Sequence, residues 1–176
     1  TSVRFDNVRV GKEHVLGEFG KGFKIAMNIL NSGRTGLGGG CVGAMKKAIA
    51  LSAKQAKERR QFGKPIAAFQ AVKHAAAQML VTVESSLSVT LLAAASVQEG
   101  TPDARLHAAA AKAQVTQHCA ELADSALTVH GAIGYTWEYD LQLFYKRAKL
   151  DRILFGSPEA WNERLASLLP LVPASA

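Results

Sequence analysis

The chain has 176 residues, of which 48% are hydrophobic and 20% charged, with 21 Lys and Arg against 14 Asp and Glu. This composition indicates one globular domain with its own core and excludes collagen, disordered tails and coiled-coil fibres. The formal net charge of +7 permits nucleic acid, an acidic membrane or a phosphorylated cofactor as a partner, and its sign does not choose among them.

The cysteine pattern and the lack of a leader pattern predict a reducing, cytoplasmic setting. Cys41 and Cys119 have neither the number nor the spacing of a disulfide framework or a metal site. The longest apolar stretches, such as residues 91–97, are far shorter than the roughly 20 residues of a membrane-spanning helix, so we expect no membrane span. Residues 1–5 show no leader pattern and no initiating Met, which is typical of the middle of a longer polypeptide.

Residues 1–20 are expected to be the end of a β domain or a linker. Residues 3–5 and 8–10 alternate apolar and polar side chains around Asp6-Asn7, which predicts two short strands joined by a turn. A pair of strands this short is not stable alone. We therefore expect their partner strands upstream of Thr1.

Residues 21–169 are rich in helix formers, and their Gly and Pro residues stand mainly at the joints. This pattern predicts helices at about residues 22–60, 69–98, 103–130, 138–151 and 158–169. Long helices joined by short loops predict an all-α fold, an antiparallel up-down four-helix bundle with a short N-terminal β remnant. Residues 170–176 are expected to form a loose tail.

Glycines are concentrated in the first helix, at Gly36, Gly38, Gly39, Gly40 and Gly43. Each glycine costs a helix roughly 1 kcal/mol relative to Ala, so a close contact should compensate. That contact is either another helix or a flat ligand. Further along, Gly63 is expected to end the helix in the left-handed conformation before Pro65, and Asp103 to cap the third helix.

Several common catalytic and binding motifs are absent from the sequence. His74, His107, His118 and His130 stand singly on different predicted helices with no Glu-x-x-His pair, so no metal site is expected. Gly-x-Ser-x-Gly, a phosphate loop and a Cys/His nucleophile arrangement are also missing. The basic residues at 54–64 suit the negative end of a helix dipole and lack interleaved aromatics, so we expect no nucleic-acid binding.

Arg59, Gln61 and Phe62 form a more specific group within that basic run. A guanidinium pairs with phosphate, an amide bonds a diphosphate or ribose oxygen, and an aromatic ring faces a flat heterocycle. Together these side chains favour contact with a nucleotide cofactor.

Three segments carry a family resemblance. Val-Arg-Phe-Asp-Asn-Val-Arg-Val at 3–10, Glu-Arg-Arg-Gln-Phe-Gly-Lys-Pro-Ile at 58–66 and His-Gly-Ala-Ile-Gly-Tyr-Thr-Trp-Glu at 130–138 strongly resemble the C-terminal portion of the acyl-CoA dehydrogenase family. The resemblance covers essentially the whole chain, and the second segment is its most specific part. It implies the last strands of a middle β domain followed by the C-terminal helical bundle.

The resemblance also implies a function. Members of the family remove the α and β hydrogens of an acyl-CoA, passing the hydride to FAD and then to an electron-transfer flavoprotein, and the bundle forms the core of a dimer or tetramer. Whether this chain forms a homo- or hetero-oligomer is left open. The FAD-contacting positions implied here are Arg59, Gln61, Phe62, Ile66, Phe69, Gln70, Thr128, Gly131 and Ala132. Arg34 matches an arginine near the acyl-CoA. The family usually has Gln at position 128 and Gly at position 132.

The catalytic base is missing from both places where the family carries it. The usual Glu position holds Phe155, and the alternative position on the first helix holds Gly33. Asp151 and Glu159 each lie four residues from Phe155, so a shift of register would promote either of them. Three interpretations stay open: an active dehydrogenase with a displaced base, a silent partner subunit or structural half, and a ligand-free oligomerisation module.

Overall fold

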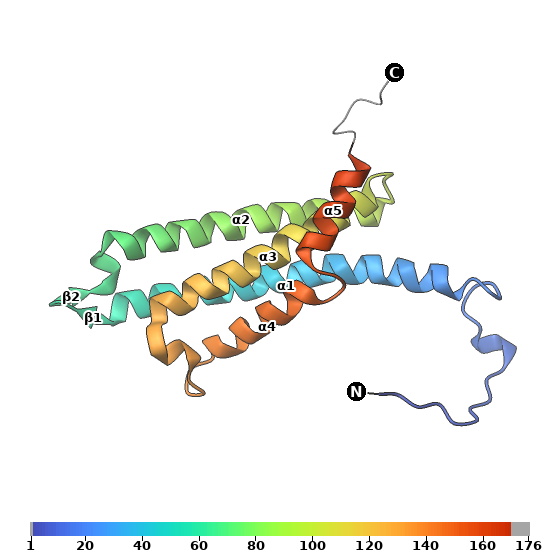
Figure 1. The fold of residues 1–176 in the computed structure, drawn as a ribbon, viewed down its shortest axis with the longest axis horizontal. Coiled ribbons are helices and arrows are strands. Elements are labelled where there is room, and N and C mark those ends of the chain that lie inside the picture. Colours follow the sequence, from blue (N-terminus) through green and yellow to red (C-terminus); the bar gives the residue numbers. More distant parts are fainter. Residues whose placement is uncertain (1, 170–176) are drawn as a thin grey trace, which may run out of the picture.

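The computed structural model describes residues 2–169 (Figure 1). In chain order its elements are the 3-10 helix η1 (Lys12–His14), α1 (Gly22–Glu58), β1 (Arg60–Gln61), β2 (Lys64–Pro65), η2 (Ile66–Ala68), α2 (Gln70–Glu99), α3 (Ala104–His130), η3 (Gly131–Tyr135), α4 (Leu141–Ile153) and α5 (Pro158–Leu168). The all-α fold class is confirmed. The expected tail at 170–176 lies outside the described residues.

Helix α3 lies at the centre of the bundle and packs against α1, α2, α4 and α5. Figure 1 shows α1, α2 and α3 lying side by side along the long axis, with the shorter α4 below α3. Helix α5 lies at the end of the bundle opposite the hairpin β1–β2. Alanines on the buried faces of α3 let its neighbours approach closely. The larger core side chains include Met45, Met79, Val83, Leu122 and Leu141.

The two short strands expected at residues 3–5 and 8–10 do not form within this chain, and the sheet with upstream strands that we expect for them stays a prediction. Within residues 2–20 the structure contains the single turn of η1 and no strand, and Val3 and Phe5 are exposed. A strand exists only through hydrogen bonds to a neighbouring strand, and this chain supplies none for these residues. Their alternating pattern therefore does not by itself produce a sheet.

Helix α1 passes unbroken through its glycines, and a close contact occurs at one of them. A Cβ atom on Gly38 would lie 3.3 Å from Thr90 Oγ1 on α2, so these two helices meet there. At Gly36, Gly39, Gly40 and Gly43 a Cβ atom would meet nothing within 4 Å. That face of α1 is left approachable within the described residues.

Gly63 turns a small hairpin and does not end the first helix. Helix α1 stops at Glu58, and β1 and β2 pair antiparallel with Arg60 opposite Pro65. The two turn residues, Phe62 and Gly63, have φ angles of 51° and 77°, both positive as in the type I′ turn of a two-residue hairpin. The hairpin carries the Phe62 side chain out of the bundle.

The other helix boundaries lie within a few residues of expectation. Asp103 occupies the N-cap position of α3, but its side chain accepts no capping hydrogen bond. Helix α4 begins at Leu141, three residues later than expected, because η3 and a turn occupy the preceding residues. Pro158 is the first residue of α5, where the Ser157 hydroxyl accepts a bond from the Ala160 amide.

Helix α2 (Gln70–Glu99) is the one helix in the described part of the chain whose length and composition would suit a membrane span. The mean hydropathy of its most apolar 18 residues is 1.6. The helix also packs against α1 and α3 as a bundle helix. A single helix of this kind is weak support for a span, and the expected lack of one stays a prediction.

Candidate functional site

An open groove of about 530 Å³ runs along the glycine face of α1, bordered by α4 and the loop after it. Its lining residues are Gly33, Gly36, Leu37, Gly40, Ala44, Arg147, Asp151, Leu154 and Phe155. The Phe155 Cζ atom lies 3.9 Å from the place where a Cβ atom on Gly33 would stand. Both positions at which the sequence suggested a base therefore border the same point of this groove.

The loop that carries Phe155 is held in an unusual backbone conformation. Phe155 and Gly156 have φ angles of 59° and 100°, both in the left-handed region. The Trp161 indole Nε1 donates a hydrogen bond of 2.8 Å to the Phe155 carbonyl, which ties the loop to α5. A Cβ atom on Gly156 would lie 2.9 Å from the same nitrogen, so this close approach requires glycine.

Asp151 borders the groove, but both of its carboxylate oxygens are engaged. Oδ1 accepts a 2.7 Å hydrogen bond from Arg147 Nε, and Oδ2 accepts a 3.7 Å bond from the Cys41 thiol. The Asp151 side chain is only 5% exposed. The pKa of Cys41 is raised, chiefly by its hydrogen bond with Cys119 and by burial, so its thiol keeps the proton it donates. Both carboxylate oxygens of Asp151 are therefore used in bonds within the bundle.

Glu159 is also paired, on the outer surface. It forms an ion pair with Arg152. Hydrogen bonds from its own backbone and from Ser157, with the charge of Arg152 adding to them, lower the pKa of Glu159. A carboxyl group with a lowered pKa is a weaker proton acceptor. The structure brings neither Asp151 nor Glu159 into the place of a free base.

Lys112 on α3 binds the end of α4, directly before the same loop, and it was not among the residues expected to matter. Its Nζ is buried and donates to the carbonyls of Arg152 at 2.8 Å and Asp151 at 3.3 Å, and to Thr116 Oγ1 at 3.3 Å. Desolvation lowers the pKa of Lys112. This ammonium caps the C-terminal end of α4, directly before Leu154 and Phe155. A lysine within an alanine-rich helix face was the available signal.

The hairpin residues suggested for cofactor binding are exposed at one end of the bundle. The Phe62 ring is 89% exposed and meets Phe69 edge-on, with ring centroids 6.0 Å apart. Arg59 and Gln61 are exposed on either side of the hairpin start, while Ile66 is half-buried and Gln70 exposed. The structure thus brings Phe62 and Phe69 together and leaves the neighbouring polar groups open to a ligand.

Thr128, Gly131 and Ala132 share a second hollow, of about 310 Å³, with Asp124, Leu127 and Tyr135. Gly131 has a φ angle of 69°, and a Cβ atom there would meet nothing within 4 Å. The backbone at Gly131 is therefore open to close approach. Because α1 and α3 both end here, this hollow and the hairpin lie at the same end of the bundle (Figure 1).

Arg34 lies apart from the hairpin residues and lines neither the groove nor the Gly131 hollow. Its Cζ stands 4.5 Å from the centroid of the Trp161 ring. Burial, followed by the positive charge of Arg164, lowers the pKa of Arg34. The structure therefore places this suggested substrate residue beside α5.

Three of the four histidines named above, His107, His118 and His130, form hydrogen bonds within the bundle, whereas His74 is exposed. Ser86 bonds His118 at 3.0 Å and Ser96 bonds His107 at 2.7 Å, joining α2 to α3. His130 Nδ1 bonds the Ala126 carbonyl at 2.7 Å. Among residues 2–169, no three His, Cys, Asp or Glu side chains gather in a way that could hold a metal ion.

Comparison with known proteins gives a consistent result. A family profile described as acyl-CoA dehydrogenase, C-terminal domain, matches residues 20–168. The caffeyl-CoA reductase-Etf complex subunit CarC of Acetobacterium woodii is 32% identical over 169 residues, which are 96% of this chain and 44% of that protein.

Solved structures agree with this match. Butyryl-CoA dehydrogenase from Megasphaera elsdenii has a TM-score of 0.87 and 34% identity, over 93% of this chain and 43% of that one. An acyl-CoA dehydrogenase complexed with FAD, from Bacillus anthracis, has a TM-score of 0.80 and 28% identity, over 92% of this chain and 32% of that one. The chain spans less than half the length of these similar proteins.

Proposed function

The chain belongs to the acyl-CoA dehydrogenase family, and on this premise we propose that it is the C-terminal helical part of a flavin-dependent enzyme that dehydrogenates an acyl-CoA thioester between its α and β carbons. The observation that carries the proposal is the family match over residues 20–168, which includes the groove, the hairpin and the Gly131 hollow. In this role the chain contributes cofactor contacts and the core of an oligomer.

The exposed groups at the hairpin end fit FAD. Arg59 offers a guanidinium to a phosphate, Phe62 an exposed ring to a heterocycle, and Gly131 an open stretch of backbone. Bound FAD supplies the acceptor for the hydride that leaves the β carbon of the substrate. We assign Gln61, Ile66, Phe69, Gln70, Thr128 and Ala132 to the surroundings of the same cofactor.

The groove along α1 is the place we assign to the acyl thioester. The α1 side of the groove carries no side chains at three positions, Gly33, Gly36 and Gly40. A ligand in the groove can therefore approach the helix backbone closely. The α proton must leave to a base as the β hydride leaves. Neither Gly33 nor Phe155 can accept a proton, and Asp151 is already bonded to Arg147 and Cys41.

A second candidate function follows from that missing base: a catalytically silent subunit or structural half that completes the flavin site of another chain. The observation that favours it is the aromatic ring of Phe155 standing against Gly33, which makes the reacting point apolar. The cofactor contacts at the hairpin end do not depend on a base. A silent subunit can therefore keep them.

An anaerobic titration separates the two candidates. The complete gene product that contains this sequence is purified with its flavin and titrated with saturated acyl-CoAs of increasing chain length, following the flavin absorbance. Bleaching supports the active enzyme. Bound flavin that never bleaches supports the silent subunit, and a complete gene product without flavin contradicts both.

We extend the proposal to partners and location. Exposed apolar side chains on α2, including Leu80, Val81, Leu91 and Leu92, support assembly into a dimer or tetramer, with copies of this chain or with a related one. The similarity to an Etf complex subunit supports an electron-transfer flavoprotein as redox partner. Two free thiols support a reducing, cytoplasmic location.

A further inference from the structure

The backbone at Gly131, which joins α3 to η3, has a conformation that glycine adopts far more readily than other residues. Its φ and ψ angles are 69° and −150°, in a region of backbone space that residues with a Cβ atom avoid. This turn lines the hollow of about 310 Å³ described above. Contacts that fix the residues on either side of Gly131 therefore also fix how its open backbone is presented to a ligand.

The residue directly before this turn, His130, is buried and bonded through both ring nitrogens. Nδ1 lies 2.7 Å from the Ala126 carbonyl oxygen, and Nε2 lies 3.2 Å from the Tyr139 hydroxyl oxygen. A carbonyl oxygen only accepts hydrogen bonds, so Nδ1 carries the proton, and Nε2 of the neutral ring is an acceptor. The Tyr139 hydroxyl is therefore the donor to the neutral His130 ring.

The bond between His130 and Tyr139 closes residues 131–138 into a loop against the end of α3. The two ring centroids are 5.0 Å apart, and Tyr139 also packs against the main core cluster. Within the loop, a Cβ atom on Gly134 would lie 2.8 Å from Leu127 Cδ1 and 3.1 Å from His130 Cβ, so η3 lies directly on the last turn of α3. The loop is thus fixed to α3 both at its far end and in its middle.

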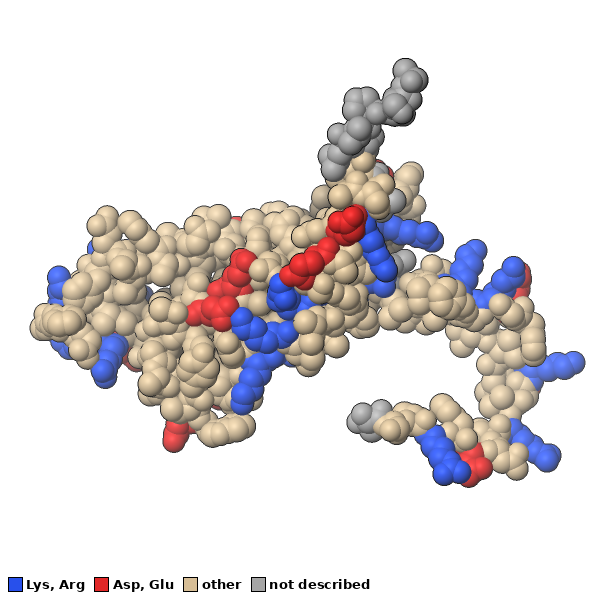
Figure 2. Space-filling view, viewed as in Figure 1, with Lys and Arg blue, Asp and Glu red and all other residues tan. Residues whose placement is uncertain are grey.

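Hydrogen bonds and close packing hold this loop, and charge does not. Residues 131–136 carry no charged side chain. Figure 2 shows Lys and Arg side chains over α4, whereas the surface over η3 is mostly uncharged. The His130–Tyr139 bond is the side-chain hydrogen bond that links the far end of the loop back to α3. Removing this one bond is therefore a direct way to loosen the loop.

We propose that His130 is a positioning residue for the flavin site: through its bond with Tyr139 it holds the loop so that the Gly131 backbone stays open to FAD. This role rests on the proposed function, which assigns FAD to the Gly131 hollow. His130 is buried and is not among the residues that line the hollow. It acts through the backbone that it holds, so loss of the bond should weaken FAD binding while the helices stay folded.

Two substitutions remove the bond from its two sides. Tyr139→Phe deletes the hydroxyl group and keeps the ring, and His130→Asn keeps a donor for the Ala126 carbonyl but loses the acceptor for Tyr139. The complete gene product is stripped of flavin and titrated with FAD by calorimetry. We expect each variant to raise the Kd for FAD by about tenfold. Because both act through one bond, the double variant should bind FAD no more weakly than either single variant.

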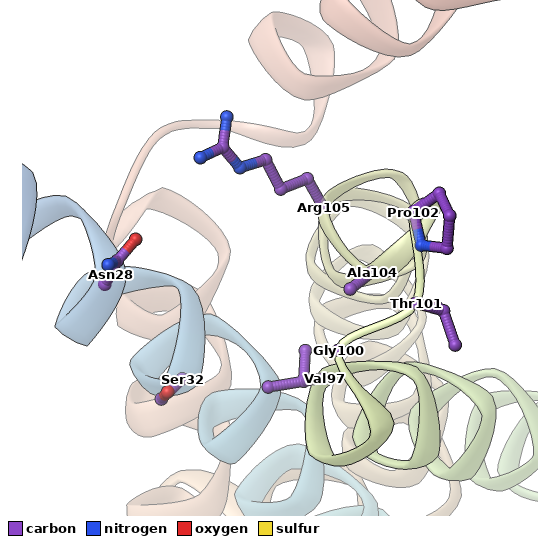
Figure 3. A pocket seen from close by; sticks show the side chains of 8 residues that line it. All are labelled: Asn28, Ser32, Val97, Gly100, Thr101, Pro102, Ala104 and Arg105. Atoms are coloured by element: carbon purple, nitrogen blue, oxygen red, sulfur yellow. The ribbon is translucent and has the colours of Figure 1, made fainter.

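Ser96→Ala is the matched control, because it deletes another hydroxyl–histidine bond, the 2.7 Å bond between Ser96 and His107. This bond lies beside the turn between α2 and α3 that Figure 3 shows, at the opposite end of α3 from Gly131. Its loss should lower the thermal midpoint about as much as Tyr139→Phe does and leave the Kd for FAD unchanged. Equal weakening of FAD binding in Ser96→Ala, or an unchanged Kd in Tyr139→Phe, overturns the proposal.

Hydrogen exchange of the flavin-free protein measures the holding of the loop separately from the cofactor. In Tyr139→Phe the amides of residues 131–139 should exchange faster, while those of α1 and α2 should not change. Unaltered exchange in residues 131–139 overturns the proposal. A native gene product that binds no FAD rejects the proposed function and with it this role of His130, whereas FAD binding that Tyr139→Phe leaves unchanged rejects the role of His130 and keeps the proposed function.

Discussion

The Cζ atom of Phe155 lies 3.9 Å from the point where a side chain on Gly33 would begin, although one residue is in the loop after α4 and the other is on α1. A carboxylate from either position would therefore reach the same region of the groove. In this chain that region holds an aromatic ring and a bare helix backbone. The relationship gives a direct way to test whether the groove is a reaction site that lacks only its base.

Phe155→Glu should introduce proton abstraction into the flavin-loaded complete gene product. The new carboxylate stands beside the groove with no positively charged partner among its lining residues except Arg147, which is already bonded to Asp151. A positioned general base contributes about 10²–10⁴-fold to a proton transfer. The measurement is the rate of anaerobic flavin bleaching by a saturated acyl-CoA.

Phe155→Gln is the matched control, since it has the same shape without the charge. A rate increase in the Glu variant alone assigns the groove to α-proton removal. Equal rates in the two variants would falsify the placement of the thioester in this groove.

Asp151→Asn tests whether the native carboxylate serves as a base. Because both Asp151 oxygens accept bonds inside the protein, we expect the substitution to lower the free energy of unfolding by about 1–3 kcal/mol. Bleaching per folded, flavin-loaded molecule should not change. Chemical denaturation gives the first quantity and stopped-flow absorbance the second. Abolished bleaching with unaltered stability would instead make Asp151 the base.

Lys112→Met tests the capping of α4. Methionine fills similar space but leaves the carbonyls of Asp151 and Arg152 without their donor, which should cost about 1–3 kcal/mol. Desolvation lowers the pKa of Lys112 in the folded chain below its ordinary value of 10.5. At pH values between the lowered pKa and 10.5, Lys112 is protonated in the unfolded chain and neutral in the folded chain. The contribution of Lys112 to the free energy of unfolding therefore rises with pH.

The pH dependence distinguishes the ammonium group from simple packing. Denaturation midpoints of the native chain and of Lys112→Met are compared from neutral pH up to about pH 10, a window below the unfolded pKa. The native chain should gain stability relative to the variant as the pH rises. A difference that shrinks with pH contradicts a desolvated Lys112.

The helices were predictable from the sequence because their apolar spacing and their Gly and Pro joints are local signals. The strands expected at 3–5 and 8–10 stay a prediction, because a strand forms only with partner strands and those were expected upstream of Thr1. Gly33 and Phe155 were suggested for the same role by resemblance, but their proximity arises only when α4 packs beside α1. Lys112 stood out only as a lysine within an alanine-rich helix, and its role could not be read from that signal because the carbonyls that it caps belong to α4, far away along the chain.

Phe62→Ala should reduce flavin retention without unfolding the chain. The Phe62 ring is 89% exposed, so its removal should change the free energy of unfolding by only about 0.5 kcal/mol. If the ring packs on the cofactor in the assembled protein, its loss should weaken FAD binding by about tenfold, as expected for one buried aromatic contact. The ratio of flavin to protein after dialysis, together with the thermal midpoint, measures both effects.

Arg59→Gln should reduce flavin retention, whereas the matched variant Lys57→Gln should leave it unchanged. Both residues are exposed and both substitutions remove one positive charge near the end of α1, so their effects on the helix dipole should be similar. Only Arg59 is assigned to a cofactor phosphate. Flavin loss confined to Arg59→Gln therefore indicates a specific contact, and equal loss in both variants indicates a general electrostatic effect of this basic end of the bundle.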